Sequence, residues 1–467
     1  MLVSAQVPST SSYRRMNDDS VWLPIYPPPE NPSFPKPDLP SPPREPFWKS
    51  LSSHPAYSLS THIIPAAFLR STPEIDLPCP PHSCEGKKTR QNSIREGVDR
   101  LWELRRKEND RRLQLGAPIK FERRLWLCLN RYVRKDVNSK NRRHKGLTLF
   151  CAHANGFNKE TWEPMIYHLL SSPAGNDIEE IWVWESIQHG DSGLLNAGRL
   201  SSLFHWFDGT RDLLNFLIYF LPTTITATLP VHLPRVPPEE STRRLQRGLS
   251  RRTLIAVGHS LGGSLISRAC LSYPQFFSAL ALVDPVIIPL SEPILWKVLD
   301  GMATGAFGRR TSWPSRESAY TSLAISPFFK PWHPDVLRLY VEGGLYPTSP
   351  SPSPCSCFSG SPVEYKLKLD AITEATVFTD TITGCADIWD RFHEIDENIE
   401  IKWIMPGDYD GLVNRKSTKE RVNLRPANSS HVTIPGCGHL IAQEKPKELA
   451  EEIANFVTKY AEKKAKL

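Results

Sequence analysis

From about residue 121 onward, continuous apolar runs alternate with segments whose apolar residues recur at helical spacing. Runs that are apolar throughout, rather than alternately polar, are typical of strands buried on both faces. The predicted strands are 124–133, 146–156, 180–186, 253–260, 277–285, 399–408 and 429–439, and the predicted helices are 159–172, 208–221, 261–274 and 445–464. This alternation predicts an α/β fold in which a mostly parallel sheet is flanked by helices.

Two stretches interrupt the alternation. Residues 222–250, which are rich in Pro and Thr, are predicted to form a surface insertion. Residues 288–398 contain helical segments and a Ser/Pro-rich loop between two predicted strands, and we expect them to form a helical cap over the carboxyl edge of the sheet. The core is therefore expected in two parts, residues 121–287 and residues 399–467.

The chain before the core differs from it in composition. Pro and Ser crowd residues 1–90, and such a segment cannot bury enough apolar surface to offset its ordering entropy, so we expect it to be mostly irregular. Residues 91–120 include a basic helical pattern, SIREGVDRLWELRRKENDRRLQL. A charge run of this kind usually forms a solvated helix face, and contact with an acidic partner is the alternative.

Charge and cysteine content narrow the function. The net charge of +7 is small for 467 residues, and no nucleic-acid-binding motif gathers the basic residues, so we expect no nucleic-acid partner. The longest apolar stretch, 213–221, is far shorter than the roughly 20 residues that cross a bilayer, so no membrane span is expected. The motifs CPPHSC (79–84) and CSC (355–357) lack a second Cys/His pair at zinc spacing. We therefore expect no metal ion and no cofactor.

The hexapeptide GHSLGG (258–263) lies between the apolar run TLIAV and a predicted helix. The pattern G-x-S-x-G is a weak signal alone, but a nucleophilic serine needs this strand, sharp turn and helix around it. The glycines allow the strained turn, which brings the Ser260 hydroxyl to the start of the helix, where backbone N–H groups face developing negative charge. An ordinary Gly/Ser turn is the alternative interpretation.

A serine nucleophile needs a base and a carboxylate. His439 follows the last predicted strand, and parallel strands would bring it to the same sheet edge as Ser260. The order Ser, acid, His matches a known hydrolase arrangement. Asp410, which lies three residues past Gly407 in the loop after the penultimate strand, is the first choice for the acid. Asp284, at the end of the strand 277–285, is the second choice.

Acyl transfer also needs donors for an oxyanion. One donor is expected to be the backbone N–H of Leu261, the residue after the nucleophile. The other is expected from the loop after an early strand, HANGF (153–157), where Asn155 is the first candidate and Phe157 the second.

These residues together resemble the α/β-hydrolase superfamily over roughly residues 121–462. The resemblance is closer to fungal peroxisomal hydrolases, a group that includes a peroxisomal lipase and toxin-cluster hydrolases. The motifs that carry it are FCAHANGFNKETWEP, QHGDSG (188–193), VGHSLGG, RRTSWPSRESA (309–319) and WHPDVLRLYVEGGL (332–345). The resemblance implies an α/β-hydrolase fold with the triad Ser260, Asp410 and His439. The Pro-rich N-terminus and the insertion 222–250 depart from that family.

The combined prediction is a serine hydrolase that cleaves a lipophilic ester or thioester through an acyl-enzyme. Aromatic residues of the predicted cap either line an apolar acyl pocket or form the core of the cap itself. These residues are Trp313, Tyr320, Phe328, Phe329 and Trp332. A tailoring hydrolase of secondary-metabolite biosynthesis and a non-catalytic binding protein of the same fold are the alternatives.

The last three residues, AKL (465–467), are one step from Ser-Lys-Leu, the address that the peroxisomal import receptor reads. The sequence therefore predicts import from the cytosol into the peroxisomal matrix, with that receptor as a partner.

Overall fold

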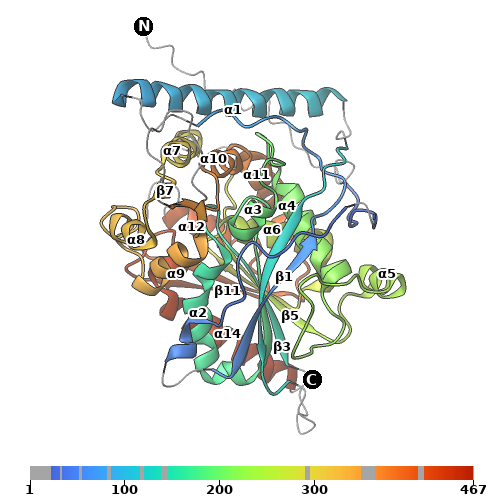
Figure 1. Ribbon diagram of the computed structural model, residues 1–467. Helices are drawn as coiled ribbons and strands as arrows, with labels where there is room; N and C mark the ends of the chain where they lie inside the picture. Colours follow the sequence, from blue (N-terminus) through green and yellow to red (C-terminus); the bar gives the residue numbers. More distant parts are fainter. Residues whose placement is uncertain are drawn as a thin grey trace.

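A central sheet with helices on both faces makes up most of the chain that the structure describes (Figure 1). The structure is a computed structural model that describes residues 23–31, 34–51, 55–80, 86–115, 120–137, 146–289, 295–348, 363–408 and 415–465. The sheet has eight strands in the order β1-β2-β4-β3-β5-β6-β10-β11. Their bounds are Tyr57–Pro65 (β1), Trp126–Arg134 (β2), Leu147–Ala152 (β3), Ile178–Trp184 (β4), Thr253–His259 (β5), Ala279–Val283 (β6), Glu400–Pro406 (β10) and Ser429–Ile434 (β11).

From β4 across the sheet to β11 all neighbours run parallel, whereas β2 is antiparallel to both β1 and β4. The prediction of a mostly parallel sheet is confirmed. Every residue of β3, β5 and β6 is buried, which explains why these strands are apolar throughout instead of alternating. Within β3, Phe150 faces one hydrophobic cluster whereas Leu149 and Cys151 face the other, as the two-residue period of a strand requires.

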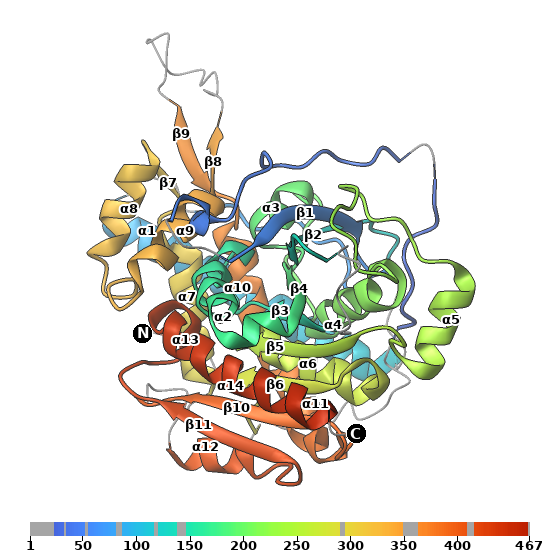
Figure 2. The same ribbon diagram turned by 90° about the horizontal axis from the view of Figure 1, so that it is seen from below.

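Those two hydrophobic clusters attach the helices to the two faces of the sheet. Helices α4 (Trp206–Asn215), α6 (Leu261–Ser272) and α11 (Thr381–Arg391) pack on one face. Helices α2 (Glu163–Ser171) and α14 (Pro446–Ala465) pack against each other on the opposite face (Figure 2). The buried sheet therefore lies between two helical layers, and the carboxyl ends of its parallel strands share one edge.

Beyond that edge lies the region predicted as a helical cap. It contains helices α7 (Leu295–Gly308), α8 (Arg316–Ala324), α9 (Pro334–Gly344) and α10 (Ala371–Thr379), and the small antiparallel strands β7 (Ser312–Trp313), β8 (Leu345–Thr348) and β9 (Glu364–Leu367). The last helix of the predicted cap, α11, instead packs against α4 and α6 on the face of the sheet. Cys385 and Ile388 of α11 therefore belong to the same hydrophobic cluster as residues of α4 and α6.

The first 90 residues, predicted to be mostly irregular, contain strand β1, which was not predicted from the sequence. This strand pairs with β2 along its whole length, from Tyr57 with Arg134 to Pro65 with Trp126. Ile63 and Ile64 are fully buried. The composition of residues 1–90 is dominated by Pro and Ser, and an average over the whole segment does not reveal the nine residues that form a strand.

The basic helix is α1 (Lys87–Leu115), which crosses over the cap helices at one end of the molecule (Figure 1). Val98 and Leu101 are fully buried in a cluster with residues of α7 and α10. Arg105 is also buried, and it pairs with Asp380 at 2.7 Å between Nη1 and Oδ1. The expectation of a solvated helix therefore holds for only one side of α1, because the other side packs on the cap.

The predicted insertion 222–250 contains helix α5 (Pro238–Arg247) and a segment that covers the outer edge of β1. The N–H of Ile63 donates to the carbonyl of Val231 at 2.7 Å, and the N–H of Leu233 donates to the carbonyl of Ile63 at 3.2 Å. Because an unpaired strand edge invites pairing with other chains, this contact protects β1.

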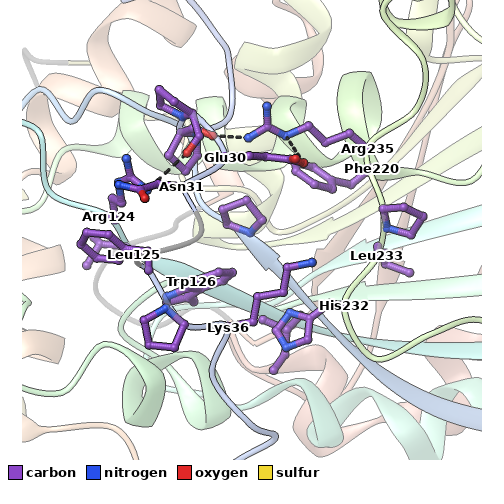
Figure 3. A pocket seen from close by; sticks show the side chains of 17 residues that line it. Glu30, Asn31, Lys36, Arg124, Leu125, Trp126, Phe220, His232, Leu233 and Arg235 are labelled. Atoms are coloured by element: carbon purple, nitrogen blue, oxygen red, sulfur yellow. Dashed lines mark hydrogen bonds and ion pairs between the residues drawn. The ribbon is translucent and has the colours of Figure 1, made fainter.

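A cavity of about 410 Å³ lies beside this edge, between the insertion and the Pro-rich N-terminal segment (Figure 3). Arg235 donates to the carbonyl of Pro28, and Arg124 Nη1 donates to the carbonyl of Pro29 at 3.2 Å. The bond from Arg235 to Pro28 therefore joins the two segments that depart from the resembled family, and both segments line this cavity.

Candidate active site

Ser260 lies between the end of β5 and the start of α6, as the sequence predicts. Its backbone has φ 54° and ψ −117°, a conformation that residues other than glycine rarely adopt. Glycine is required on both sides of the turn. A Cβ at Gly262 would lie 2.2 Å from the carbonyl oxygen of Ala152, and one at Gly258 would lie 2.6 Å from Gly263 Cα. The strained turn is therefore held by close contact between strands and helix, and it presents the Ser260 hydroxyl at the sheet edge.

His439 lies in the loop between β11 and helix α13 (Ile441–Glu444), and its ring meets Ser260. The distance from His439 Nε2 to Ser260 Oγ is 2.8 Å. On the other side of the ring, Nδ1 lies 2.6 Å from Oδ2 of Asp284. The two polar atoms of the imidazole thus contact a hydroxyl and a carboxylate, which is the geometry of a general base held by an acid.

Asp284 is fully buried directly after β6, with a positive φ of 34°. Its other oxygen, Oδ1, accepts from Arg421 Nη1 at 2.9 Å. Burial raises the pKa of Asp284, but the charges of Arg421 and His439 and their hydrogen bonds outweigh it and lower the pKa to about 2. Asp284 is therefore ionised at neutral pH and can only accept. This puts the proton on His439 Nδ1 and leaves Nε2 free to accept the Ser260 proton.

The sequence prediction for the acid needs to be compared with this arrangement. Asp410, the first choice, lies outside the described residues. The carboxylate that contacts His439 is that of Asp284, the second choice. Sequence reasoning missed Arg421 entirely. It lies in the strongly basic helix α12 (Arg415–Val422), where nothing in the pattern distinguishes it from its solvent-exposed neighbours.

A cavity of about 750 Å³ opens onto Ser260 and His439. Phe328 and Phe329 of the cap line it, and Trp206 and Val286 contribute from the body of the protein. The cap aromatics were expected either to line an acyl pocket or to form the core of the cap, and each alternative holds for some of them. Phe328 lines the cavity, and Trp313, Tyr320 and Trp332 pack in the cap core. Phe329 does both.

Both predicted oxyanion residues, Asn155 and Leu261, line the same cavity, as does Phe157. The turn after β3 is fixed from two sides. The N–H of Gly156 donates to His189 Nε2 at 3.0 Å, and Asn155 Nδ2 donates to the carbonyl of Glu374 in α10 at 3.3 Å. Burial, then the nearby His153 and Arg309, lower the pKa of His189 well below its usual range, so its ring is neutral and can accept.

These groups can carry out nucleophilic acyl transfer: a hydroxyl beside an imidazole, with a buried carboxylate behind it and an apolar cavity in front. Among the residues that the structure describes, no cluster of three or more His, Cys, Asp or Glu side chains is arranged to hold a metal ion. None of the described helices combines the length and apolar character needed to cross a membrane.

Comparison with known proteins gives matches of several kinds. A family model described as "Alpha/beta hydrolase family" matches residues 149–452. The type I acyl-CoA thioesterase mpaH of Penicillium roqueforti is 31% identical over 175 residues, 37% of this chain and 34% of the relative. The chain thus spans only about a third of the length of that relative. The abhydrolase domain-containing protein AFT2-1 of Alternaria alternata is 26% identical over 231 residues, 44% of this chain and 83% of the relative.

The peroxisomal membrane protein LPX1 of Saccharomyces cerevisiae is 27% identical over 167 residues, 35% of this chain and 37% of the relative. A crystal structure described as the peroxisomal α/β-hydrolase Lpx1 of the same yeast superposes with a TM-score of 0.57. It covers 88% of this chain and 89% of that chain at 16% identity, a level that shows the shared fold alone.

Proposed function

The chain belongs to the alpha/beta hydrolase family, and we propose that it is a serine hydrolase that cleaves a lipophilic ester or thioester. One observation carries this proposal: His439 contacts Ser260 Oγ at 2.8 Å with one ring nitrogen and Asp284 at 2.6 Å with the other. In this proposal Ser260 is the nucleophile, His439 the general base and Asp284 the acid that orients the base.

The reaction has two steps. Ser260 Oγ attacks the acyl carbonyl while its proton passes to His439 Nε2, and His439 then returns that proton to the departing alcohol or thiol. Water next gives a proton to His439 and attacks the acyl-enzyme, which releases the acid and restores the Ser260 hydroxyl. The backbone N–H groups of Leu261 and Asn155 hold the oxyanion in both steps, where each such donor contributes about 3–4 kcal/mol.

The substrate class is supported by the cavity and by one group of relatives. Phe328, Phe329 and Trp206 give the cavity apolar walls, which suit a lipophilic acyl group. The relative from Penicillium roqueforti is named an acyl-CoA thioesterase, which favours a thioester substrate, with a thiol as the leaving group, over an ester. A tailoring role in secondary metabolism uses the same chemistry and differs only in the acyl group.

We test this function with the purified full chain and a fluorophosphonate probe that labels reactive serines. The wild type is expected to be labelled and to hydrolyse acyl-CoA thioesters and lipophilic esters, and Ser260→Ala is expected to lose both activities. Ser267→Ala is the matched control, because Ser267 is buried two turns further along α6 and its hydroxyl donates to the carbonyl of Gly263. A wild type that neither reacts with the probe nor hydrolyses any of these substrates would favour the non-catalytic alternative.

The peroxisomal location belongs to the same proposal. It is supported by the relative LPX1, whose name describes it as peroxisomal. Lys466 and Leu467 of the predicted address lie outside the described residues. A fluorescent protein fused before residue 1 is expected to collect in peroxisomes, and removal of residues 465–467 is expected to leave it in the cytosol.

A further inference from the structure

Helix α7 carries two glycines, Gly301 and Gly305, in its interior. Residues four apart lie on the same face of a helix, and both glycines line the cavity that contains Ser260 and His439. A Cβ placed on either glycine would meet no atom of a described residue within 4 Å. The backbone of α7 is therefore bare toward the cavity over one helical turn.

Other glycines nearby have a packing reason that these two lack. A Cβ on Gly97 of α1 would lie 2.2 Å from the ring of Phe307, and one on Gly308 would lie 2.8 Å from Ile94. Gly301 and Gly305 have no such neighbour, and neither has a positive φ. Because glycine inside a helix is less stable than alanine, a helix that keeps two of them without a structural reason points to a functional one.

The two faces of α7 are used differently. Ala303 and Phe307 are buried against α1 and α10. The face toward the cavity holds the two glycines together with Val298 and Met302. One side of the helix is thus buried in a hydrophobic cluster, whereas the other is left open at its centre.

We propose that Gly301 and Gly305 set the width of the acyl-binding part of the active-site cavity and so select acyl groups broader than a straight alkyl chain. The absent side chains leave a slot between the α7 backbone and the aromatic walls, which include Phe329 and Phe378. A branched or ring-bearing acyl group fills that slot and contacts these rings. This inference rests on the proposed function, since it names the acyl group that Ser260 receives.

The first test compares two esters of the same alcohol, an acetate and a naphthoate, in the wild type and in Gly305→Leu. The added side chain occupies the slot, so the ratio of kcat/KM for naphthoate over acetate is expected to fall at least tenfold. Lys297→Leu is the matched control, because it adds leucine to an exposed position of the same helix that does not line the cavity. A ratio that changes less than twofold in Gly305→Leu would overturn the proposal.

A second measurement does not depend on catalysis. In a Ser260→Ala background, binding of free 2-naphthoic acid is followed by its fluorescence, and Gly305→Leu is expected to raise Kd at least tenfold while Lys297→Leu does not. If the wild type hydrolyses nothing but this difference is seen, the proposed function fails and the slot stands. Equal Kd values in all three proteins would overturn the slot alone.

The stability of alanine variants tests the premise. Gly301→Ala combined with Gly305→Ala is expected to raise Tm by about 2 °C, because alanine favours the helix and meets open space. A lower Tm would mean that the glycines serve packing after all, and would contradict the proposal.

Discussion

Two cavities of this protein, one over the carboxyl edge of the sheet and one beside β1, use polar side chains in opposite ways. In the cavity over the carboxyl edge, Ser260 and His439 contact each other and remain accessible from an apolar space. In the cavity beside β1, His232 and Arg235 are bonded to carbonyl oxygens of the protein's own N-terminal segment, at Pro37 and Pro28. One cavity keeps its polar groups available for a reaction, and the other has used them for folding.

The difference shows that charged side chains in a cavity do not by themselves indicate a binding site. A guanidinium that already donates to backbone carbonyls has less to offer a ligand, because a ligand would have to replace those bonds. A hydroxyl paired with a base gains from the arrival of a carbonyl carbon, because the pair then transfers its proton. Four predictions sharpen or break this comparison.

The largest expected effect is on the acid behind the base. Asp284→Asn removes the charge that holds the protonated ring, and kcat is expected to fall about 10³–10⁴-fold. The comparison variant is Asp410→Asn, which is expected to keep kcat within about threefold. Ester hydrolysis by both variants checks this, and the opposite pattern would give the role of the acid back to Asp410.

The next effect concerns the support of that acid. Arg421→Met leaves the Asp284 carboxylate buried without its guanidinium partner, and the free energy of unfolding is expected to fall by about 3–5 kcal/mol. The pKa of Asp284 rises at the same time, so the acid limb of the kcat/KM profile moves to higher pH. Urea unfolding and a pH profile measure the two effects. An unchanged profile would show that Arg421 does not act on the site.

The third prediction concerns pH and the β1 side. Burial, with a smaller effect of Arg131, outweighs the bond to Pro230 and lowers the pKa of His62 from 6.5 to about 4. The folded state therefore binds this proton less readily than the unfolded state. The stability that the neutral His62 contributes to the folded state is fully present above pH 6.5. It is lost as pH falls toward 4, and the free energy of unfolding falls by about 3 kcal/mol. His62→Gln is expected to remove that part of the pH dependence, measured by urea unfolding at pH 7 and pH 4. Parallel curves for wild type and variant would contradict it.

The smallest expected effect tests whether the cavity beside β1 is only structural. Arg235→Ala loses the bond to the carbonyl of Pro28, and the free energy of unfolding is expected to fall by about 1 kcal/mol, since this side chain is partly exposed. Ester hydrolysis is expected to stay within twofold of the wild type. A tenfold loss of kcat/KM at unchanged stability would show that this cavity takes part in function.

Much of the fold could be predicted because the strands near Ser260 are buried on both faces and so carry an unbroken apolar signal. The comparisons with known proteins confirmed the resemblance to α/β-hydrolases and to the fungal peroxisomal group. β1 escaped prediction because its pairing with β2 depends on residues more than sixty positions away. The packing of α1 escaped for a similar reason, since its charged pattern conceals Val98 and Leu101.

The candidate nucleophile and base could be predicted because local sequence features mark them. The acid remained ambiguous because its choice depends on the order of the strands in the sheet. Ser260 is marked by its turn and His439 by its place after the last strand. Two carboxylates follow strands on the same edge, and chain order does not separate Asp284 from Asp410. The sheet order does bear on it, because β6 is the direct neighbour of β5 and β10 lies one strand further away. Strand order is a property of the folded chain and is not written in any single segment.

The position of α1 has a consequence for how ligands reach the cavity that contains Ser260. Its Arg95 pairs with Asp300 of α7 at 2.8 Å, and its buried Arg105 pairs with Asp380 beyond the end of α10. Ion pairs thus join α1 to α7 and to Asp380. Moving these cap segments away from α1 as one unit would break the buried pair of Arg105 and Asp380. Phe328, which lines the cavity, is 54% exposed, so its side chain can rotate without displacing the packed helices. Exposed side chains change rotamer within nanoseconds, so we expect ligands to enter past Phe328 and not through movement of the whole cap.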